Sequence, residues 1–239
     1  MQAVINPAKE PHAKSSVGLD LRDMILGGQD GLVNVLGVIL AVASATNSTK
    51  IVLISGLAAT FAESISMAAV GYTSSKAAKS FYESEQEREK REMKDVPQIE
   101  RQEIRDIYYQ KGFRGKVLDS IVRHITSNNK LWLKTMMEEE LKLNKGEWEK
   151  PWRNALVIGI AAVIGSIIPL FPFFFLSVKA GIITVIILSA IVLFISGYLK
   201  TKITIGNPVK GGLEMAAIGM FAALAGYGIG AIMGAAFGA

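Results

Sequence analysis

Two carboxylates lie inside apolar stretches that are long enough to cross a membrane. Asp30 falls within residues 24–45, and Glu63 falls within residues 51–75. A charged side chain at the centre of a bilayer costs about 2.5–3.5 kcal/mol on insertion scales, so such a residue normally marks an ion path or a proton relay. The alternative is an interhelical hydrogen bond that only holds the helices together. We interpret the chain as a membrane protein that handles cations.

Further donor groups stand one helical turn from these two acids. Asn34 follows Asp30, and Met67 follows Glu63, each at i, i+4, so each pair shares a helix face. Glycines around Asp30 allow a neighbouring helix to approach closely. Carboxylates, a thioether and nearby serine oxygens could replace part of the hydration shell of a divalent cation, and the carboxylates could take up a proton when it leaves. The predicted transport pathway is Asp30, Asn34, Glu63 and Met67.

A second group of potential ligands lies in the charge-dense middle of the chain. Its carboxylates and methionines recur at helical spacing: Glu85, Glu89 and Glu92; Glu100 and Glu103; Met136 and Met137 with Glu140. Three helices could thus aim carboxylates and a thioether at one point, and such ligands suit Fe(II) and Mn(II). The alternative is a set of solvated helices with Glu–Lys pairs, in which the methionines only fill the core.

Five apolar stretches would position these groups. They lie at about 24–45, 51–75, 154–176, 180–198 and 213–237. Each approaches or exceeds the roughly 20 residues that a membrane-crossing helix needs. We therefore predict an all-α integral membrane protein with five transmembrane helices and a cytosolic helical insertion between spans two and three.

The predicted organisation has three parts. Residues 1–75 would hold the N-terminal segment and spans one and two, residues 76–153 the carboxylate-rich metal-binding module, and residues 154–239 spans three to five. Lys50 and Lys179 are the only basic residues in the loops after spans one and three. The positive-inside rule then places the N-terminus and the insertion in the cytosol.

Helix-breaking residues predict the local boundaries. We expect residues 15–26 to form a short interfacial helix. The helix of span two should continue to Met93, the next should run from Pro97 to about Lys111, and two more should span about 115–127 and 130–143. Two prolines should end or kink span three. Glycines at every fourth position of span five form a small-residue ridge, either within the bundle or across a dimer.

Composition excludes several other functions. The chain has no cysteine, which excludes disulfides and thiolate chemistry, and its two histidines are too few for a three-histidine zinc site within one chain. Basic residues alternate with acidic ones, so the net charge of +5 does not indicate a nucleic-acid partner. The Glu-x-x-His ligands of di-iron bundles are absent. We predict that the protein is not an enzyme.

Several segments, in their order along the chain, resemble the vacuolar iron transporter family of divalent-metal/proton exchangers. They are GGQDGL (27–32), AESISMAAVGY (62–72), the glutamate-rich continuation of span two, MMEEEL (136–141) and IIPLFPFFF (167–175). The resemblance implies a homodimer whose pathway is lined by spans one and two, and export of Fe(II), and of Mn(II), from the cytosol in exchange for protons.

The resemblance also assigns residues. Asp30 and Met67 match the pathway aspartate and methionine of the family. Glu89, Glu92, Glu100 and Glu103 match its cytosolic metal-binding glutamates, and Met137 and Glu140 match those on the last helix, where MMEEEL offers several registers. One position departs from the pattern. Many members carry a glutamate two turns before the methionine, where this chain has Ala59, and Glu63 lies one turn closer.

We predict a proton-coupled divalent-metal transporter with no permanently bound cofactor. Its partners would be metal ions, protons, the lipid bilayer and a second copy of the chain, and it would serve metal-ion homeostasis. The alternative is a membrane-anchored metal buffer or sensor that does not transport. The expected location is a prokaryotic cell membrane, or a vacuolar-type membrane if the source is eukaryotic.

Overall fold

The computed structural model describes residues 15–144, 150–204 and 206–237, and these residues contain helices and no strand. The chain divides into two compact units. The first, here called the bundle, comprises residues 1–73 and 151–239. The second, here called the insertion, comprises residues 74–150.

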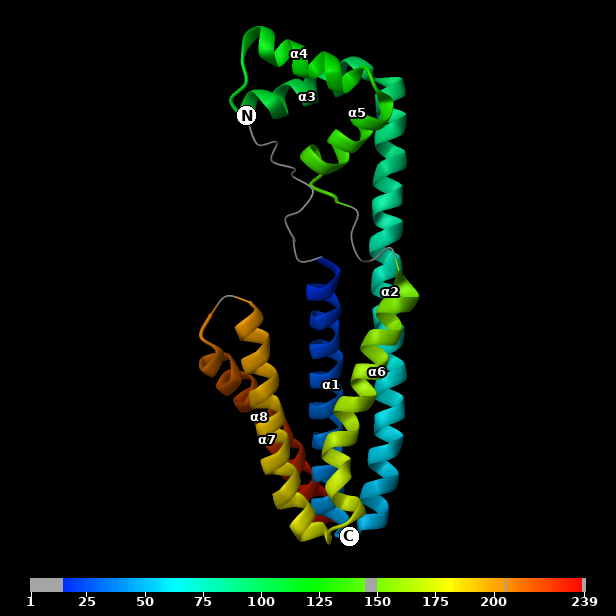
Figure 1. The fold of residues 1–239 in the computed structure, drawn as a ribbon. Helices are drawn as coiled ribbons and strands as arrows, with labels where there is room; N and C mark the ends of the chain where they lie inside the picture. The colour runs from blue at the N-terminus through cyan, green and yellow to red at the C-terminus, as the bar shows by residue number, and fades with distance from the viewer. Residues whose placement is uncertain (1–14, 145–149, 205, 238–239) are drawn as a thin grey trace, which may run out of the picture. The chain divides into compact units, whose positions relative to one another are not determined.

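Five long helices supply the bundle (Figure 1): α1 Ser15–Thr46, the first part of α2 Thr49–Asp95, α6 Pro151–Leu170, α7 Val178–Ile203 and α8 Pro208–Phe237. All five are long and apolar enough to cross a membrane. The five predicted spans therefore correspond to five candidate membrane-spanning helices. On α7 the exposed isoleucines recur at i+4, namely Ile183, Ile187, Ile191 and Ile195. An apolar stripe of this kind on the outside of a helical bundle suits contact with hydrocarbon rather than with water.

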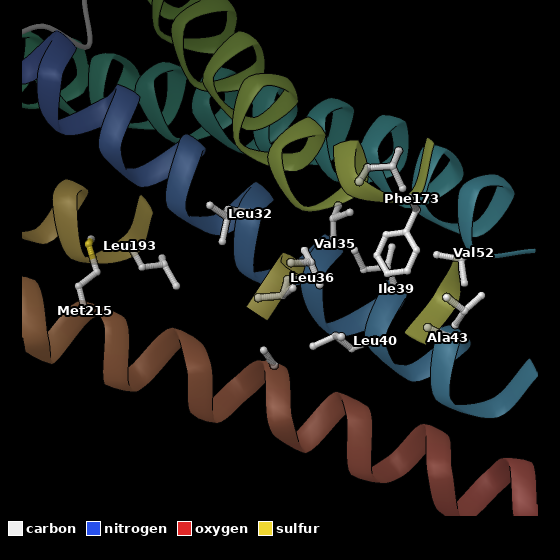
Figure 2. Packing of buried hydrophobic residues seen from close by; sticks show 14 residues of the cluster. Leu32, Val35, Leu36, Ile39, Leu40, Ala43, Val52, Phe173, Leu193 and Met215 are labelled. Carbon is white, nitrogen blue, oxygen red and sulfur yellow. The ribbon is translucent and has the colours of Figure 1, made fainter. Parts of the chain in front are cut away.

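Helix α1 forms the centre of the bundle. It packs along α6, α8 and α7, and α7 packs along α8. Its buried side chains, among them Leu36 and Ile39, meet Val52 of α2, Phe173 and Leu193 in one apolar cluster (Figure 2). An acid on α1 is therefore held on a helix that is fixed from several sides.

Small residues let α1 approach its neighbours closely. A Cβ atom on Gly31 would lie 2.7 Å from Ser166 Oγ of α6, so only glycine fits there. On α8, the glycines of the ridge up to Gly234 pack against α1 within the same chain, whereas Gly238 lies outside the described residues. A Cβ on Gly226 would lie 2.7 Å from the Gly37 carbonyl oxygen, and one on Gly234 would lie 2.8 Å from Ala45 Cα. In this structure the ridge thus serves packing inside the bundle.

The insertion contains the end of α2, then α3 Pro97–Gln110, α4 Gly115–Thr126, α5 Asn129–Thr135 and a π-helical turn, η2, Met136–Glu140. Pro97 occupies the first turn of α3, and Gly112 follows that helix with a φ of +98°. Asn128 Oδ1 caps α5 by accepting hydrogen bonds from the backbone N–H groups of Lys130 (2.9 Å) and Leu131 (3.3 Å).

Helix α2 is too long to lie wholly within a bilayer. Its 47 residues correspond to about 70 Å at 1.5 Å per residue, whereas the hydrocarbon core is only about 30 Å thick. Part of this helix must therefore extend into water. The charged residues of α2 all lie at or beyond its middle, apart from Lys50 at its start and Glu63.

Two local predictions need correction. Residues 15–26 do not form a separate helix, because α1 runs without a break from Ser15 to Thr46. The helix predicted over 130–143 is an α-helix only as far as Thr135, where the π-helical turn begins. The prediction for span three is confirmed, since α6 contains Pro169 near its end, stops at Leu170 and continues as a short 3₁₀ turn, η4, Phe171–Phe174.

Candidate metal-binding and transport sites

Three of the predicted pathway residues meet in the bundle. The half-buried carboxyl group of Glu63 on α2 lies close enough to the side chains of Asp30 and Asn34 of α1 to interact with both. Asp30 is half-buried and Asn34 is exposed. Two carboxyl groups and an amide so close together offer a set of oxygen ligands for a cation.

The glycines beside Asp30 explain how the trio is placed. Gly27 and Gly31 face α6, where a Cβ on either one would collide with backbone of Ile158 or Ala162. Asp30 lies on an adjoining side of α1 and Asn34 one turn further along it, so both can face α2. The tight contact with α6 thus fixes the rotation of α1 that presents these two side chains to Glu63.

Met67, the fourth predicted pathway residue, is half-buried one turn beyond Glu63 on α2. The shared helix face places its thioether on the side of Glu63. The position two turns before Met67 is Ala59, which packs against the apolar cluster of the bundle. A carboxylate at residue 59 would enter that cluster, whereas one at residue 63 meets Asp30.

The insertion gathers five of the predicted ligands. Electrostatic repulsion links the carboxyl groups of Glu89, Glu92, Glu100, Glu103 and Glu140, which come from α2, α3 and the π-helical turn. We call these five residues the glutamate cluster. Glu89 is only 2% exposed and Glu100 only 3% exposed, and each has a carboxylate oxygen without a hydrogen-bond partner among the described residues. Buried carboxylate oxygens with no donor are suited to a cation.

Burial and mutual repulsion raise several pKa values in the glutamate cluster. The pKa of Glu100 rises to about 7 because its carboxyl is desolvated and Glu103 and Glu89 repel its charge. Desolvation and repulsion from Glu103 and Glu89 likewise raise the pKa of Glu140 to about 7. Desolvation and neighbouring acids also raise the pKa values of Glu89 and Glu103. Near neutral pH the cluster therefore holds exchangeable protons that a metal ion would displace.

Arg88 lies among these carboxylates, although its position in the sequence does not mark it as part of a site. Its guanidinium is 2.8 Å from Glu85 Oε2, 3.5 Å from Glu89 Oε1 and 3.6 Å from Glu92 Oε2. Its spacing from Glu85 and Glu92 is that of ordinary solvated ion pairs on a helix, so the sequence does not indicate that Arg88 belongs to the site. Glu85 joins the group only through this arginine, whose positive charge partly neutralises the cluster.

The two methionines of the π-helical turn have different surroundings. Both are buried, but Met136 belongs to an apolar cluster with Ile104, Ile125 and Trp132, and Met137 is not a member of that cluster. The turn closes with hydrogen bonds from the Leu141 N–H to the Met136 carbonyl (3.1 Å) and from the Leu143 N–H to the Met137 carbonyl (2.8 Å). Met136 thus has a packing role, and Met137 is the better candidate ligand.

Among the three glutamates of this turn, only Glu140 faces the glutamate cluster. Glu139 pairs with Lys111 at 2.6 Å, and Glu138 lies 3.8 Å from Lys134. The hydrogen bond from Lys111 lowers the pKa of Glu139. Of the three glutamates in MMEEEL, Glu140 is therefore the one that lies near the other acids.

The cluster is not a finished coordination shell. No three His, Cys, Asp or Glu side chains in the described part of the chain are already placed to hold a metal ion. Repulsion between carboxylates keeps them apart, and a divalent cation would offset that repulsion. Two other polar residues, His124 on α4 and Glu214 on α8, are exposed and lie outside both groups.

Known proteins resemble the chain over both units. The model of the VIT family matches residues 21–231. Vacuolar iron transporter 1 of Tulipa gesneriana is 34% identical over 224 residues, which cover 93% of this chain and 91% of that protein. Vacuolar iron transporter 1 of Arabidopsis thaliana is 31% identical over 227 residues, covering 95% and 90%. Protein CCC1 of Saccharomyces cerevisiae is 30% identical over 212 residues, covering 85% and 66%.

Proposed function

This chain belongs to the VIT family, and on that premise we propose that it moves Fe(II), and also Mn(II), out of the cytosol in exchange for protons. The relatives named as vacuolar iron transporters support transport of metal ions across a membrane. The observation that carries the proposal is the meeting of Asp30, Asn34 and Glu63 inside the bundle. A membrane anchor alone has no need of two acids in contact there.

Metal capture is the first proposed step. The glutamate cluster and Met137, which belongs to the same π-helical turn as Glu140, would offer oxygen ligands and one thioether, a set that suits Fe(II) and Mn(II) better than Mg²⁺ or Ca²⁺. Two oxygens that lack a donor would gain a partner in the metal ion. Because Glu100 and Glu140 have pKa values of about 7, capture at neutral pH would release protons.

Passage through the bundle is the second step. The metal ion would take oxygen ligands from Asp30, Glu63 and Asn34, and any proton on these acids would leave as it binds. Met67 would add a thioether one turn away. Reprotonation of the two acids from the far side would then expel the ion, as alternating access requires. Proton uptake and metal release would thus be one exchange at the same oxygen atoms.

The assembly and the location are further parts of the proposal. We propose that the protein is a homodimer. We also propose that the N-terminus and the insertion lie in the cytosol, because the basic residues gather on that side of the predicted topology. The membrane would be vacuolar in type, as in the names of the relatives, or the cell membrane of a prokaryote.

Flux measurements test this function against the alternative of a metal buffer or sensor. The protein would be reconstituted in liposomes with an acidic lumen, and influx of Fe(II), Mn(II), Zn(II) and Ca(II) would be followed together with lumenal pH. Fe(II) influx that alkalinises the lumen is the expected result. Metal binding without influx would favour a buffer or sensor. Influx at the same rate with and without the pH gradient would contradict proton coupling. Oxygen consumption on addition of Fe(II) would instead indicate an enzyme.

A further inference from the structure

A groove of about 450 Å³ lies in the bundle between the first turns of α1 and the last turns of α7, and neither Asp30 nor Glu63 lines it. The residues that line it are Leu21, Arg22, Ile25, Leu26 and Gln29 from α1, and Lys200, Ile203 and Thr204 at the end of α7. Its walls come from two helices that can each cross a membrane, and it lies near a terminus of each helix. The groove is thus placed at the boundary between hydrocarbon and water.

Two positive charges lie in this groove. Arg22 and Lys200 are both exposed, and no carboxylate in the described part of the chain forms an ion pair with either. The described lining residues include no acid. An arginine and a lysine together favour a phosphate group, since the guanidinium can donate two parallel hydrogen bonds and the ammonium can add a point charge.

The remaining walls are apolar. Leu26 is 51% exposed and Ile203 is 60% exposed, and the half-buried Ile25 lies between the helices. A free phosphate ion would leave these side chains in contact with water. A phosphate group joined to acyl chains would cover them and would gain from their burial.

We propose that this groove binds one anionic phospholipid, with its phosphate held by Arg22 and Lys200 and an acyl chain against Leu26 and Ile203. Basic pockets between transmembrane helices are a recurring way to recognise anionic headgroups. Gln29 lines the groove and can donate a hydrogen bond to a headgroup oxygen. The lipid would bridge the two helix ends, and it belongs to the leaflet on the side of Arg22.

Native mass spectrometry of the detergent-purified, delipidated full chain tests this proposal. The probes are palmitoyl-oleoyl phosphatidylglycerol, the same chains on phosphatidylcholine, and inorganic phosphate, each also measured as a shift in melting temperature. The test variant is Arg22→Gln with Lys200→Gln. The matched control is Lys202→Gln with Lys210→Gln, which removes two exposed cations outside the groove lining. Leu26→Gln tests the apolar wall.

We expect one phosphatidylglycerol to bind and to raise the melting temperature, with the test variant weakening binding by roughly tenfold or more. The control variant should bind phosphatidylglycerol as tightly as the native chain does. Leu26→Gln should weaken the binding of phosphatidylglycerol and leave any binding of inorganic phosphate unchanged. The proposal would be overturned if phosphatidylcholine bound as tightly as phosphatidylglycerol, or if the control variant lost as much affinity as the test variant. So would stabilisation by inorganic phosphate alone that depends on Arg22. If the double variant does not fold, the single variants and the native comparison of the two lipids decide the question.

Discussion

The Glu63 carboxyl on α2 lies beside the Asp30 carboxyl on α1, and the Asn34 side chain of α1 is also close to Glu63. Neither helix carries another acid in its predicted membrane-spanning part beyond these two. The pair therefore brings together the two acids of the first two spans at a single place.

Asp30→Asn should abolish Fe(II) flux in proteoliposomes while the protein still folds. An amide can keep a hydrogen bond to Glu63 but cannot carry the negative charge that a dehydrated cation needs, or exchange a proton. Asp30→Ala should have the same effect. Glu214→Gln, which changes an exposed acid at the start of α8, serves as the control and should retain flux. Native flux in either Asp30 variant would remove this residue from the pathway.

Moving the second acid by one turn should not preserve transport. Glu63→Ala should reduce flux to background, and the double variant Glu63→Ala, Ala59→Glu should not recover it. The reason is that Ala59 packs against the apolar cluster, where a carboxylate would be buried without a partner. Flux and thermal stability of the two variants would be compared. Recovery in the double variant would mean that residue 59 can reach the ion path.

Metal binding by the insertion should weaken as the pH falls from 8 to 6. Glu100 and Glu140, with pKa values of about 7, are largely ionised at pH 8 and largely protonated at pH 6. For each proton that the metal must displace, affinity should fall by about tenfold per pH unit below the pKa. Calorimetry of Mn(II) binding in two buffers would count the released protons. The pair Glu100→Gln, Glu140→Gln should flatten this slope, and Glu87→Gln should leave it unchanged.

The same shifts predict how pH acts on stability without metal. Because the folded pKa values exceed the ordinary value of 4.5, the folded insertion binds extra protons. Its stability is therefore highest below about pH 4.5 with respect to these groups and declines as the pH rises through 7. Amide hydrogen exchange in α3 and η2 should be faster at pH 8 than at pH 6 after correction for the intrinsic rate. Saturating Mn(II) at pH 8 should slow it again.

Variants of the two adjacent methionines should affect different properties, stability for Met136 and metal binding for Met137. Met136→Ala should destabilise the insertion by about 2–5 kcal/mol, because it empties a position in the cluster with Ile104 and Trp132. Met137→Leu conserves volume and should leave the melting temperature nearly unchanged while weakening Fe(II) binding. Unchanged metal affinity in Met137→Leu would leave the glutamates as the only ligands.

Arg88→Gln should increase divalent-metal affinity a few-fold. Its guanidinium sits within 4 Å of three glutamates, so its removal leaves more negative charge for a cation to neutralise. The side chain is partly exposed, and solvent screening keeps the effect small. Arg91→Gln, an exposed arginine on the same helix, is the matched control. A loss of affinity in Arg88→Gln would show that the arginine is needed to position Glu89 or Glu92.

Sequence patterns were sufficient for features that depend on local chemistry. Apolar length indicated the five spans, Pro97 and Gly112 indicated the ends of α3, and the cost of a membrane-embedded acid drew attention to Asp30 and Glu63. The contact between these two acids depends on how α1 is rotated against α6, so the sequence could suggest it without determining it. That rotation comes from the fit of Gly31 to Ser166, which is a property of two segments far apart in the sequence.

Other features were not accessible from the sequence. Helices that are apolar over most of their surface give only a weak amphipathic signal, so the central place of α1 could not be predicted. Arg88 carried the spacing of an ordinary surface ion pair. The difference between Met136 and Met137 depends on the π-helical turn, whose hydrogen bonds to Leu141 and Leu143 no propensity scale indicates.

That turn also constrains how the chain can change length. An i→i+5 turn contains one residue more than the α-helical turn that it replaces. Inserting a single residue into a regular α-helix would produce such a turn. Deleting one residue from 138–139 should let the backbone revert to α geometry and rotate Glu140 away from the other acids. In related chains, a gap of one residue at this place would then accompany a loss or a rearrangement of the carboxylates that Glu140 faces, even where every other glutamate is kept.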